Sequence, residues 1–147
     1  MATVEKRIIG RADIIDFPEF GLTDVPVKVD TGAYGSAIYS ANIVEYMVDG
    51  KKEISFQLPF SNGEEKSPVR CKDFKVKRVK SSSGHVEERY TISTTIVLFG
   101  QRIETSFSLA DRSKMKYPVL LGRNVLRSRF IVDPVKKNLS HKEKINQ

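Results

Sequence analysis

The chain has one cysteine, two histidines and no tryptophan among its 147 residues. Because a single cysteine, Cys71, cannot form an intramolecular disulfide, the composition fits a reducing compartment. No apolar run approaches the roughly 18 residues of a membrane-spanning helix. The first residues also hold no apolar core of the length found in signal peptides. These absences predict a cytoplasmic protein without a membrane partner.

The scarcity of histidine and cysteine also argues against metal chemistry. His85 falls at an expected hairpin tip and His141 lies near the C-terminus, and neither a His-x-x-x-His nor a Cys-x-x-Cys spacing occurs. A Ser-His-Asp nucleophile would need one of the same two histidines. The glycine-containing segment "GAYGSA" lacks the lysine and the following helix of a phosphate-binding loop. We therefore expect no metal site and no cofactor.

Acidic side chains are the minority, so the net charge is +7 and the isoelectric point is about 9.5. Residues 66–80 carry seven basic residues against one acid. Such a surface attracts acidic partners, which include nucleic acid and acidic polypeptides. Because the chain has neither tryptophan, nor an aromatic stacking motif, nor an evident recognition helix, nucleic acid is the less favoured partner.

Alternation of apolar and polar residues dominates the chain, as in 54–60 and 103–109, and predicts half-buried strands. The "SSSG" segment at 81–84 separates two charged strand-like runs and predicts the tip of a long hairpin. Only "GRNVLRSRF", 122–130, has a helical pattern. We therefore expect one all-β domain over 1–135, a small closed barrel with one short helix, followed by a basic, frayed tail over 136–147.

The segment "VKVDTGAYGSAIYS", 27–40, places Asp30 where an apolar strand ends. One interpretation is a turn aspartate whose carboxylate caps the next backbone N–H groups. A catalytic carboxylate near the interior is the other. A second signal follows far downstream in "VLLGRNVL", 119–126, an apolar strand that ends in glycine before a helical turn. The residues themselves leave both interpretations open.

Together the two segments resemble the retropepsin-like aspartic peptidases, in which one strand ends in Asp-Thr-Gly-Ala and another in two apolar residues and Gly-Arg-Asn. A closer resemblance, over nearly the whole chain, is to the bacterial and archaeal RimB-like family described as ATP-dependent zinc proteases and associated with RimK-type glutamate ligases. The shared motifs stand in order as "IIGR", "K-VDTGA", "DRS", "YPVLLGR" and "RFIVDP". The chain nevertheless offers neither a zinc cluster nor a nucleotide loop.

This resemblance implies a retropepsin-like closed barrel with a flap hairpin and one short helix. It also implies a homodimer, because one chain carries one Asp-Thr-Gly and the mechanism needs two carboxylates. The implied catalytic residues are Asp30, Thr31, Gly32 and Ala33. The implied substrate-binding residues are Gly84, His85, Arg123, Lys75 and Lys77. Retroviral enzymes pair the Gly-Arg-Asn arginine with an acid, but Tyr34 stands at that position here, so Arg123 needs another partner.

The family's association with glutamate ligases suggests a glutamate-rich extension of a protein tail as the substrate. A basic flap strand would then compensate the charges of the substrate. The alternative is a catalytically silent module with the same fold that binds an acidic protein partner.

Overall fold

The computed structural model describes residues 5–61, 68–80 and 83–147. Strands dominate, as the alternating pattern predicts. In chain order they are β1 (Arg7–Ile9), β2 (Ala12–Phe17), β3 (Leu22–Val29), β4 (Ser36–Tyr39), β5 (Ala41–Val48), β6 (Lys51–Gln57), β7 (Val69–Cys71), β8 (Phe74–Lys80), β9 (Val86–Leu98), β10 (Gln101–Ala110), β11 (Val119–Leu121) and β12 (Phe130–Val132). The helical segments are η1 (Pro18–Phe20), α1 (Arg123–Leu126) and α2 (Leu139–Ile145).

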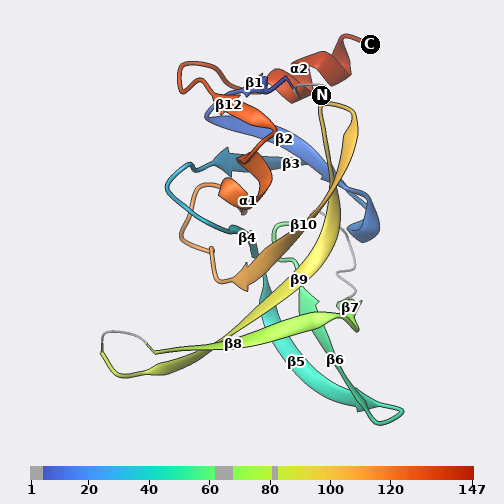
Figure 1. Cartoon of the computed structure of the whole chain (residues 1–147). Coiled ribbons are helices and arrows are strands. Elements are labelled where there is room, and N and C mark those ends of the chain that lie inside the picture. The colour runs from blue at the N-terminus through green and yellow to red at the C-terminus, as the bar shows by residue number, and fades with distance from the viewer. Residues whose placement is uncertain (1–4, 62–67, 81–82) are drawn as a thin grey trace, which may run out of the picture.

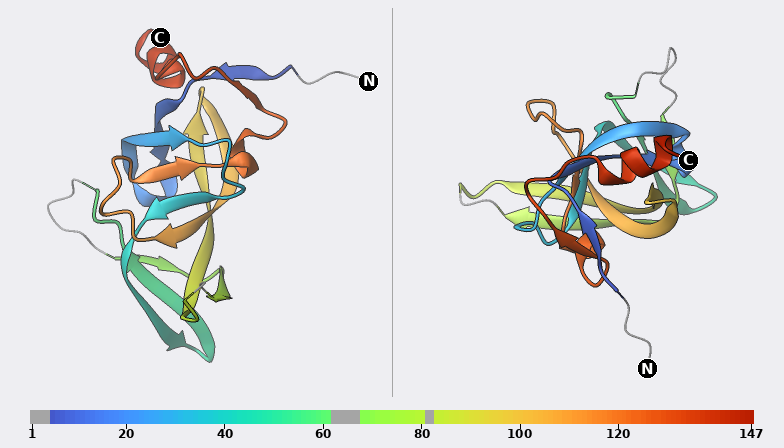
Figure 2. Two further views of the ribbon diagram at one scale, coloured as in Figure 1. Left: turned by 90° about the vertical axis from the view of Figure 1, so that its left-hand side faces the viewer. Right: turned by 90° about the horizontal axis from the view of Figure 1, so that it is seen from above.

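Six strands close into a barrel, in the order β10-β4-β11-β3-β2-β9, and the pairing of β9 with β10 completes the ring. Figure 2 shows β3, β11, β4 and β10 side by side across one wall. β3 and β11 run parallel, so both strand ends point to the same edge of the barrel. The all-β, retropepsin-like barrel predicted from the sequence is confirmed.

The interior of the barrel is filled by the apolar positions of the alternating strands. Its fully buried side chains include Phe17, Val27, Ile38, Ile96, Phe107, Val119 and Leu121. Each fully buried aliphatic or aromatic side chain contributes about 1.5–3 kcal/mol relative to exposure. Val27 on β3 and Val119 and Leu121 on β11 are packed into this core. The turns that follow these two strands are therefore held rigidly.

The predicted long hairpin is present as β8 and β9, which pair from Phe74 with Ile92 to Lys80 with Val86. It projects from the barrel beside the three-stranded sheet β5-β6-β7 (Figure 1). The second hairpin, β9–β10, turns at Phe99-Gly100, one residue earlier than the Gly100-Gln101 pair that the sequence suggests. Both turn residues have positive φ, 53° and 71°, which is the geometry of a two-residue hairpin turn.

The C-terminal segment is docked as helix α2, so the expectation of a frayed tail is wrong. The buried carboxylate of Asp13 on β2 accepts the N–H groups of Ser140 at 3.0 Å and His141 at 3.1 Å. Lys144 forms an ion pair with Asp16 at 3.0 Å. A carboxylate from a distant strand thus satisfies the free N–H groups at the start of the helix.

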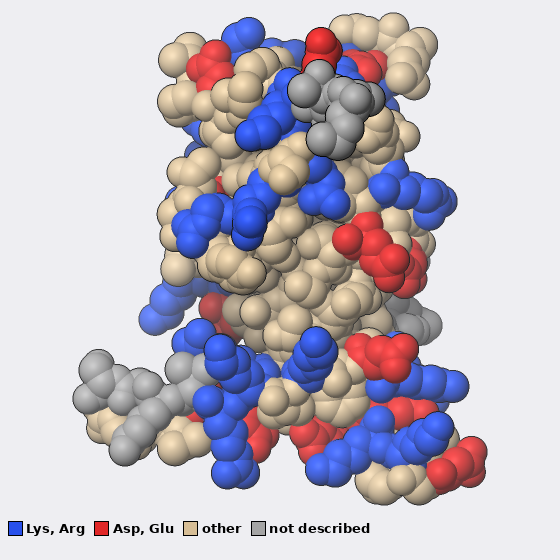
Figure 3. Space-filling view, in the orientation of Figure 1, with Lys and Arg blue, Asp and Glu red and all other residues tan. Residues whose placement is uncertain are grey.

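Charged residues of both signs are interleaved on the surface shown in Figure 3. Lysine and arginine are dense over the lower part, where the β8–β9 hairpin and the β5–β6 pair lie, and a largely uncharged band crosses the middle of this face. Among the described residues, no helix has the length and apolar character that crossing a membrane requires.

Candidate active site

Asp30 lies directly after β3, at the edge of the barrel, and is half-buried. Its N–H donates to the carbonyl of Leu121 at 2.9 Å, which ties the turn to the end of β11. Its carboxylate oxygen Oδ1 accepts the N–H of Gly32 at 2.8 Å. That contact fits a capping turn and also orients a reactive carboxylate, so the geometry accommodates both interpretations of the motif.

The end of β11 passes against the turn that carries Asp30. Arg123 donates its N–H to the carbonyl of Ala33 at 2.8 Å, and Asn124 donates to that of Tyr34 at 2.9 Å. A Cβ atom on Gly122 would lie 2.1 Å from the carbonyl oxygen of Gly35. Only glycine permits this approach of two backbone segments. The Asp-Thr-Gly-Ala and Gly-Arg-Asn motifs, whose residues Thr31 and Arg123 are 92 positions apart in the chain, therefore form one structural unit.

A polar network next to this crossing includes Ser36 and Thr105, neither of which the sequence marks as a site residue. The hydroxyl of Ser36 donates to Asn124 Oδ1 at 2.6 Å and accepts the N–H of Gly122 at 3.0 Å. The amide of Asn124 donates to Thr105 Oγ1 at 3.2 Å. Because a buried polar group is costly when unpaired, this network fixes the crossing in one arrangement.

Arg123, expected to need a substitute for its usual acidic partner, binds backbone instead. Its Nη1 donates to the carbonyl of Thr31 at 3.0 Å, and its guanidinium lies 5.8 Å from the centroid of the Tyr34 ring. Tyr34 thus replaces the acid with a cation–π contact. Arg123 supports the turn from outside, and its guanidinium donates to a carbonyl of that turn rather than to the carboxylate of Asp30.

A further arginine, Arg112, is influenced by the charge of Asp30. It lies in the 111–118 loop between β10 and β11, and its Nε donates to the carbonyl of Tyr117 at 3.1 Å. Burial lowers the pKa of Arg112, and the charge of Asp30 acts in the opposite direction. In the sequence, Arg112 stands out only as part of the Asp111-Arg112-Ser113 motif shared with the RimB-like family. That resemblance assigns no role to the individual residues.

A groove of about 700 Å³ connects the turn to the stem of the β8–β9 hairpin. It is lined by small residues, including Ala33, Gly35, Ser36, Ala37, Ser40 and Ala41, and by the exposed charged residues Glu87, Glu88, Arg89 and Asp111. The stem of the predicted flap therefore borders the space next to the Asp-Thr-Gly-Ala turn. The volume and the small lining residues suit an extended peptide.

The other predicted substrate-binding residues are spread along the hairpin. Gly84, with φ of 87°, and His85 are exposed near its tip and do not line the groove. Lys75 borders a separate hollow of about 320 Å³ with Phe74 and Thr91. Lys77 is exposed and lies opposite Arg89 across the strands. Neither Lys75 nor Lys77 lines the groove next to the Asp-Thr-Gly-Ala turn.

Tyr90 tethers the hairpin to β5. Its hydroxyl donates to Glu45 Oε1 at 2.8 Å. Burial, the hydrogen bond to Glu45 and the negative charges of Glu45 and Glu88 raise the pKa of Tyr90 to about 12. Since only the neutral phenol can donate, the tether is fully formed below pH 10 and is lost as the pH rises toward 12.

We expect this tether to be visible in a spectroscopic pH titration of the chain's five tyrosines. In the wild type, the near-ultraviolet phenolate signal should show a late step near pH 12 that Tyr90→Phe removes. Glu45→Gln should move the step to lower pH, because the amide is uncharged. Glu104→Gln, which changes an exposed acid elsewhere on the surface, is the control. Identical titrations of the wild type and Glu45→Gln would contradict the assignment.

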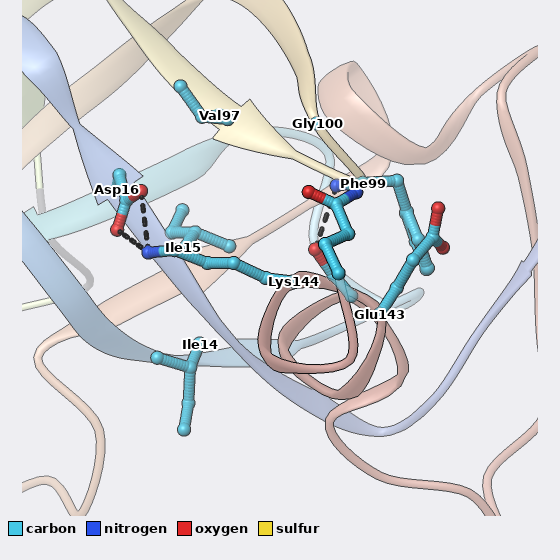
Figure 4. A pocket seen from close by; sticks show the side chains of 10 residues that line it. Ile14, Ile15, Asp16, Val97, Phe99, Gly100, Glu143 and Lys144 are labelled. Atoms are coloured by element: carbon cyan, nitrogen blue, oxygen red, sulfur yellow. Dashed lines mark hydrogen bonds and ion pairs between the residues drawn. The ribbon is translucent and has the colours of Figure 1, made fainter.

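A second hollow, of about 100 Å³, lies between α2, β2 and β9 (Figure 4). Ile14, Ile15 and Val97 form apolar walls, and Lys144 reaches over to Asp16. Its charged groups are thus occupied within the chain, and no residue of the Asp-Thr-Gly-Ala turn lines it. Within the described part of the chain, no three histidine, cysteine, aspartate or glutamate residues gather as metal ligands would.

A closed six-stranded barrel, with an Asp-Thr-Gly-Ala turn locked to a Gly-Arg-Asn crossing beneath a hairpin, defines the retropepsin-like class. Comparison with family models agrees. Residues 8–143 match the model described as "Retropepsin-like aspartic endopeptidase RimB", and the chain belongs to this RimB-like family.

Curated relatives carry a different name. The chain is 35% identical over 131 residues to a "Probable alpha-L-glutamate ligase" of Shewanella halifaxensis and 32% identical over 133 residues to one of Desulfotalea psychrophila. The matches cover 88% and 89% of this chain but only 29% of each relative. The chain thus spans less than a third of the length of these proteins.

Among solved structures, the fold is similar to that of Lpg0085, a protein of unknown function from Legionella pneumophila. The TM-score is 0.74 with 24% sequence identity, and the match covers 92% of this chain and 99% of the other. At this identity the likeness supports the fold alone.

Proposed function

We propose that the chain is a homodimeric aspartic endopeptidase in which Asp30 of each copy supplies one catalytic carboxylate. The observation that carries this proposal is the position of Asp30, half-buried and fixed at the end of a core strand beside a peptide-sized groove. A paired carboxylate that activates water requires a rigid support of this kind.

Two carboxylates about 3 Å apart cannot both ionise, so they share one proton and titrate as a unit. The ionised member takes a proton from water as general base, and the protonated member donates to the scissile carbonyl. Because the chain has one Asp-Thr-Gly, the second carboxylate must come from a second copy related by a two-fold axis. The N–H of Gly32 donates to one oxygen of the carboxylate and orients it. We assign to Thr31, which is exposed in the single chain, contacts across that axis.

We infer that the substrate is a glutamate-rich segment of a protein. The relatives named as glutamate ligases carry a domain like this chain within one longer polypeptide, and a peptidase beside such a ligase would act on the bonds that the ligase forms. The exposed cations of β8, Lys75 and Lys77, would attract acidic segments toward the hairpin. Glu87 and Glu88, which line the groove, limit where those segments can lie.

The test is turnover of a poly-glutamate peptide against a glutamine-matched peptide, with new termini identified by mass spectrometry. The acidic peptide should be preferred at low salt, and its kcat/KM should fall with added salt, since exposed charges are screened beyond roughly 8–10 Å. Lys75→Gln with Lys77→Gln should raise KM for the acidic peptide about threefold to tenfold. Lys51→Gln with Lys52→Gln, on β6, is the matched control and should change KM little. Equal, salt-independent turnover of both peptides would contradict the proposal that the substrate is glutamate-rich.

The alternative function is a silent module that holds an acidic protein segment without cleaving it. The names of the relatives favour it, because a ligase also needs a site that presents the acidic chain to be extended. Tight binding of the acidic peptide, with no turnover by any concentration of the chain, would support this alternative.

A further inference from the structure

Tyr34 is the one exposed aromatic residue in the part of the chain that the structure describes. It is 69% exposed, whereas the other described phenylalanines and tyrosines are buried or half-buried. A tyrosine in this setting holds a large apolar ring in water, and tyrosine is enriched where a protein surface meets a partner. Because Tyr34 lies four positions after Asp30, the surface that could cover its ring must reach the candidate catalytic turn.

Tyr34 lies beside the groove without lining it. Its two chain neighbours, Ala33 and Gly35, are among the described lining residues, but Tyr34 is not. Its carbonyl accepts the N–H of Asn124 at 2.9 Å, and its ring lies 5.8 Å from the guanidinium of Arg123. The crossing with the end of β11 thus fixes the backbone of Tyr34 and provides a contact for its ring. The ring is therefore presented to solvent next to the turn rather than to a peptide in the groove.

The charge of the chain restricts what two copies can bring together at this turn. Each copy has a net charge of +7, and Arg123 is exposed beside the turn, so a symmetric pair brings like charges toward the axis. The exposed residues of the turn itself are uncharged, and they are Thr31, Gly32, Tyr34 and Gly35. The ring of Tyr34 also engages the guanidinium of Arg123 in a cation–π contact. An uncharged aromatic surface is thus available where two basic chains have to meet.

We propose that Tyr34 is the aromatic contact through which two copies of this chain join beside the Asp30 pair. The inference rests on the homodimeric peptidase proposed above, because the site of one chain is incomplete without the carboxylate of a second. Two Asp30 carboxylates that share a proton bring the residues around each turn together as well. Symmetry places a Tyr34 ring on both sides of the axis, so one substitution removes two contacts from each dimer. Aromatic side chains near the centre of an interface commonly carry a large share of the binding energy.

Sedimentation equilibrium over a range of protein concentrations measures the dimer dissociation constant of the wild type and its variants. Tyr34→Ala should raise that constant by about 100-fold or more, since each of the two lost aromatic contacts contributes about tenfold. Tyr34→Phe keeps the ring and should stay within about threefold of the wild type. Met47→Ala is the matched control, because it removes an apolar side chain from a residue of β5 that is 61% exposed. Its dissociation constant should equal that of the wild type.

Activity measured against protein concentration separates a contact between copies from a contact with substrate. Dilute Tyr34→Ala should have low specific activity, and raising its concentration should restore the wild-type kcat at an unchanged KM, because the dimers that form are complete. A raised KM with an unchanged dissociation constant would assign Tyr34 to the substrate and overturn the inference. Circular dichroism of the dilute variant checks that the chain is folded.

Sedimentation needs no turnover, so it also separates this inference from the peptidase function. A dimer that Tyr34→Ala weakens, in a protein that cleaves no peptide, would support the contact and contradict the peptidase. A wild-type dimer that Tyr34→Ala leaves unchanged would overturn the contact and leave the dimeric peptidase standing. A wild type that stays monomeric at every concentration would contradict both.

Discussion

Asp30→Asn should abolish peptide cleavage, by about 10⁴-fold or more in kcat, and leave the fold intact. Asparagine has nearly the same shape, and its amide oxygen can still accept the N–H of Gly32 that the carboxylate accepts at 2.8 Å. The backbone bond from Asp30 to Leu121 is also retained. What the variant loses is the group that takes a proton from water and the group that returns it. Activity assays and thermal denaturation of the same preparation measure the two effects.

A chelator experiment accompanies this variant as a control on the mechanism. We expect EDTA to leave the cleavage rate of the wild type unchanged, since both catalytic groups are carboxylates that act on water directly. Asp30→Asn with at least a tenth of the wild-type kcat would contradict the role of Asp30. Loss of activity in EDTA that zinc restores would instead require a metal-dependent mechanism.

Gly122→Ala should be the most destabilising single methyl group that can be added at the candidate site. The new Cβ would lie 2.1 Å from the carbonyl oxygen of Gly35 and 2.8 Å from that of Ala33, and both of these are backbone atoms that cannot rotate away. Relieving the overlap would break the crossing between the end of β11 and the Asp30 turn. Overpacking of this kind costs about 3 kcal/mol, which lowers Tm by roughly 10 °C in a chain of this size. Calorimetry or chemical denaturation measures the loss.

Gly35→Ala is the matched control for this prediction. It adds the same methyl group to the other partner of the contact, where no atom lies within 4 Å of the new Cβ. We expect its stability to stay within about 0.5 kcal/mol of the wild type, as for most exposed substitutions. Equal stabilities of Gly122→Ala and Gly35→Ala would show that the crossing is looser than the contact distances imply.

Much of the fold could be predicted from local pattern. The alternating strands 54–60 and 103–109 contain Ile54, Phe56, Ile103 and Phe107, all buried as the period of two requires. Helix α2 could not be predicted in this way, because its sequence "LSHKEKI" has only two apolar residues and no side-chain cap of its own. Its N–H groups are satisfied by Asp13, 127 residues away for Ser140. A helix that depends on a tertiary cap leaves little local signal.

The candidate site, like the fold, could be predicted from the sequence only in part. The Asp30 turn and the Gly-Arg-Asn crossing are contiguous motifs, so the sequence locates them. The hydrogen bond from Ser36 to Asn124 joins residues 88 positions apart in the chain, and its role depends on a distance that only the fold sets. Arg123 illustrates the limit. The sequence shows that Tyr34 has replaced the acidic partner, but the carbonyl of Thr31 as the new partner follows only from the backbone geometry of the turn.

Subunit mixing tests the shared Asp30 pair most directly. Wild type and Asp30→Asn would be combined at constant total concentration, allowed to exchange subunits, and assayed across the range of wild-type fraction. If both carboxylates of a dimer are required, total activity should follow the square of that fraction, because only dimers of two wild-type chains are active. Activity that falls in direct proportion to the wild-type fraction would mean that each chain carries a complete site, and would contradict the two-chain mechanism.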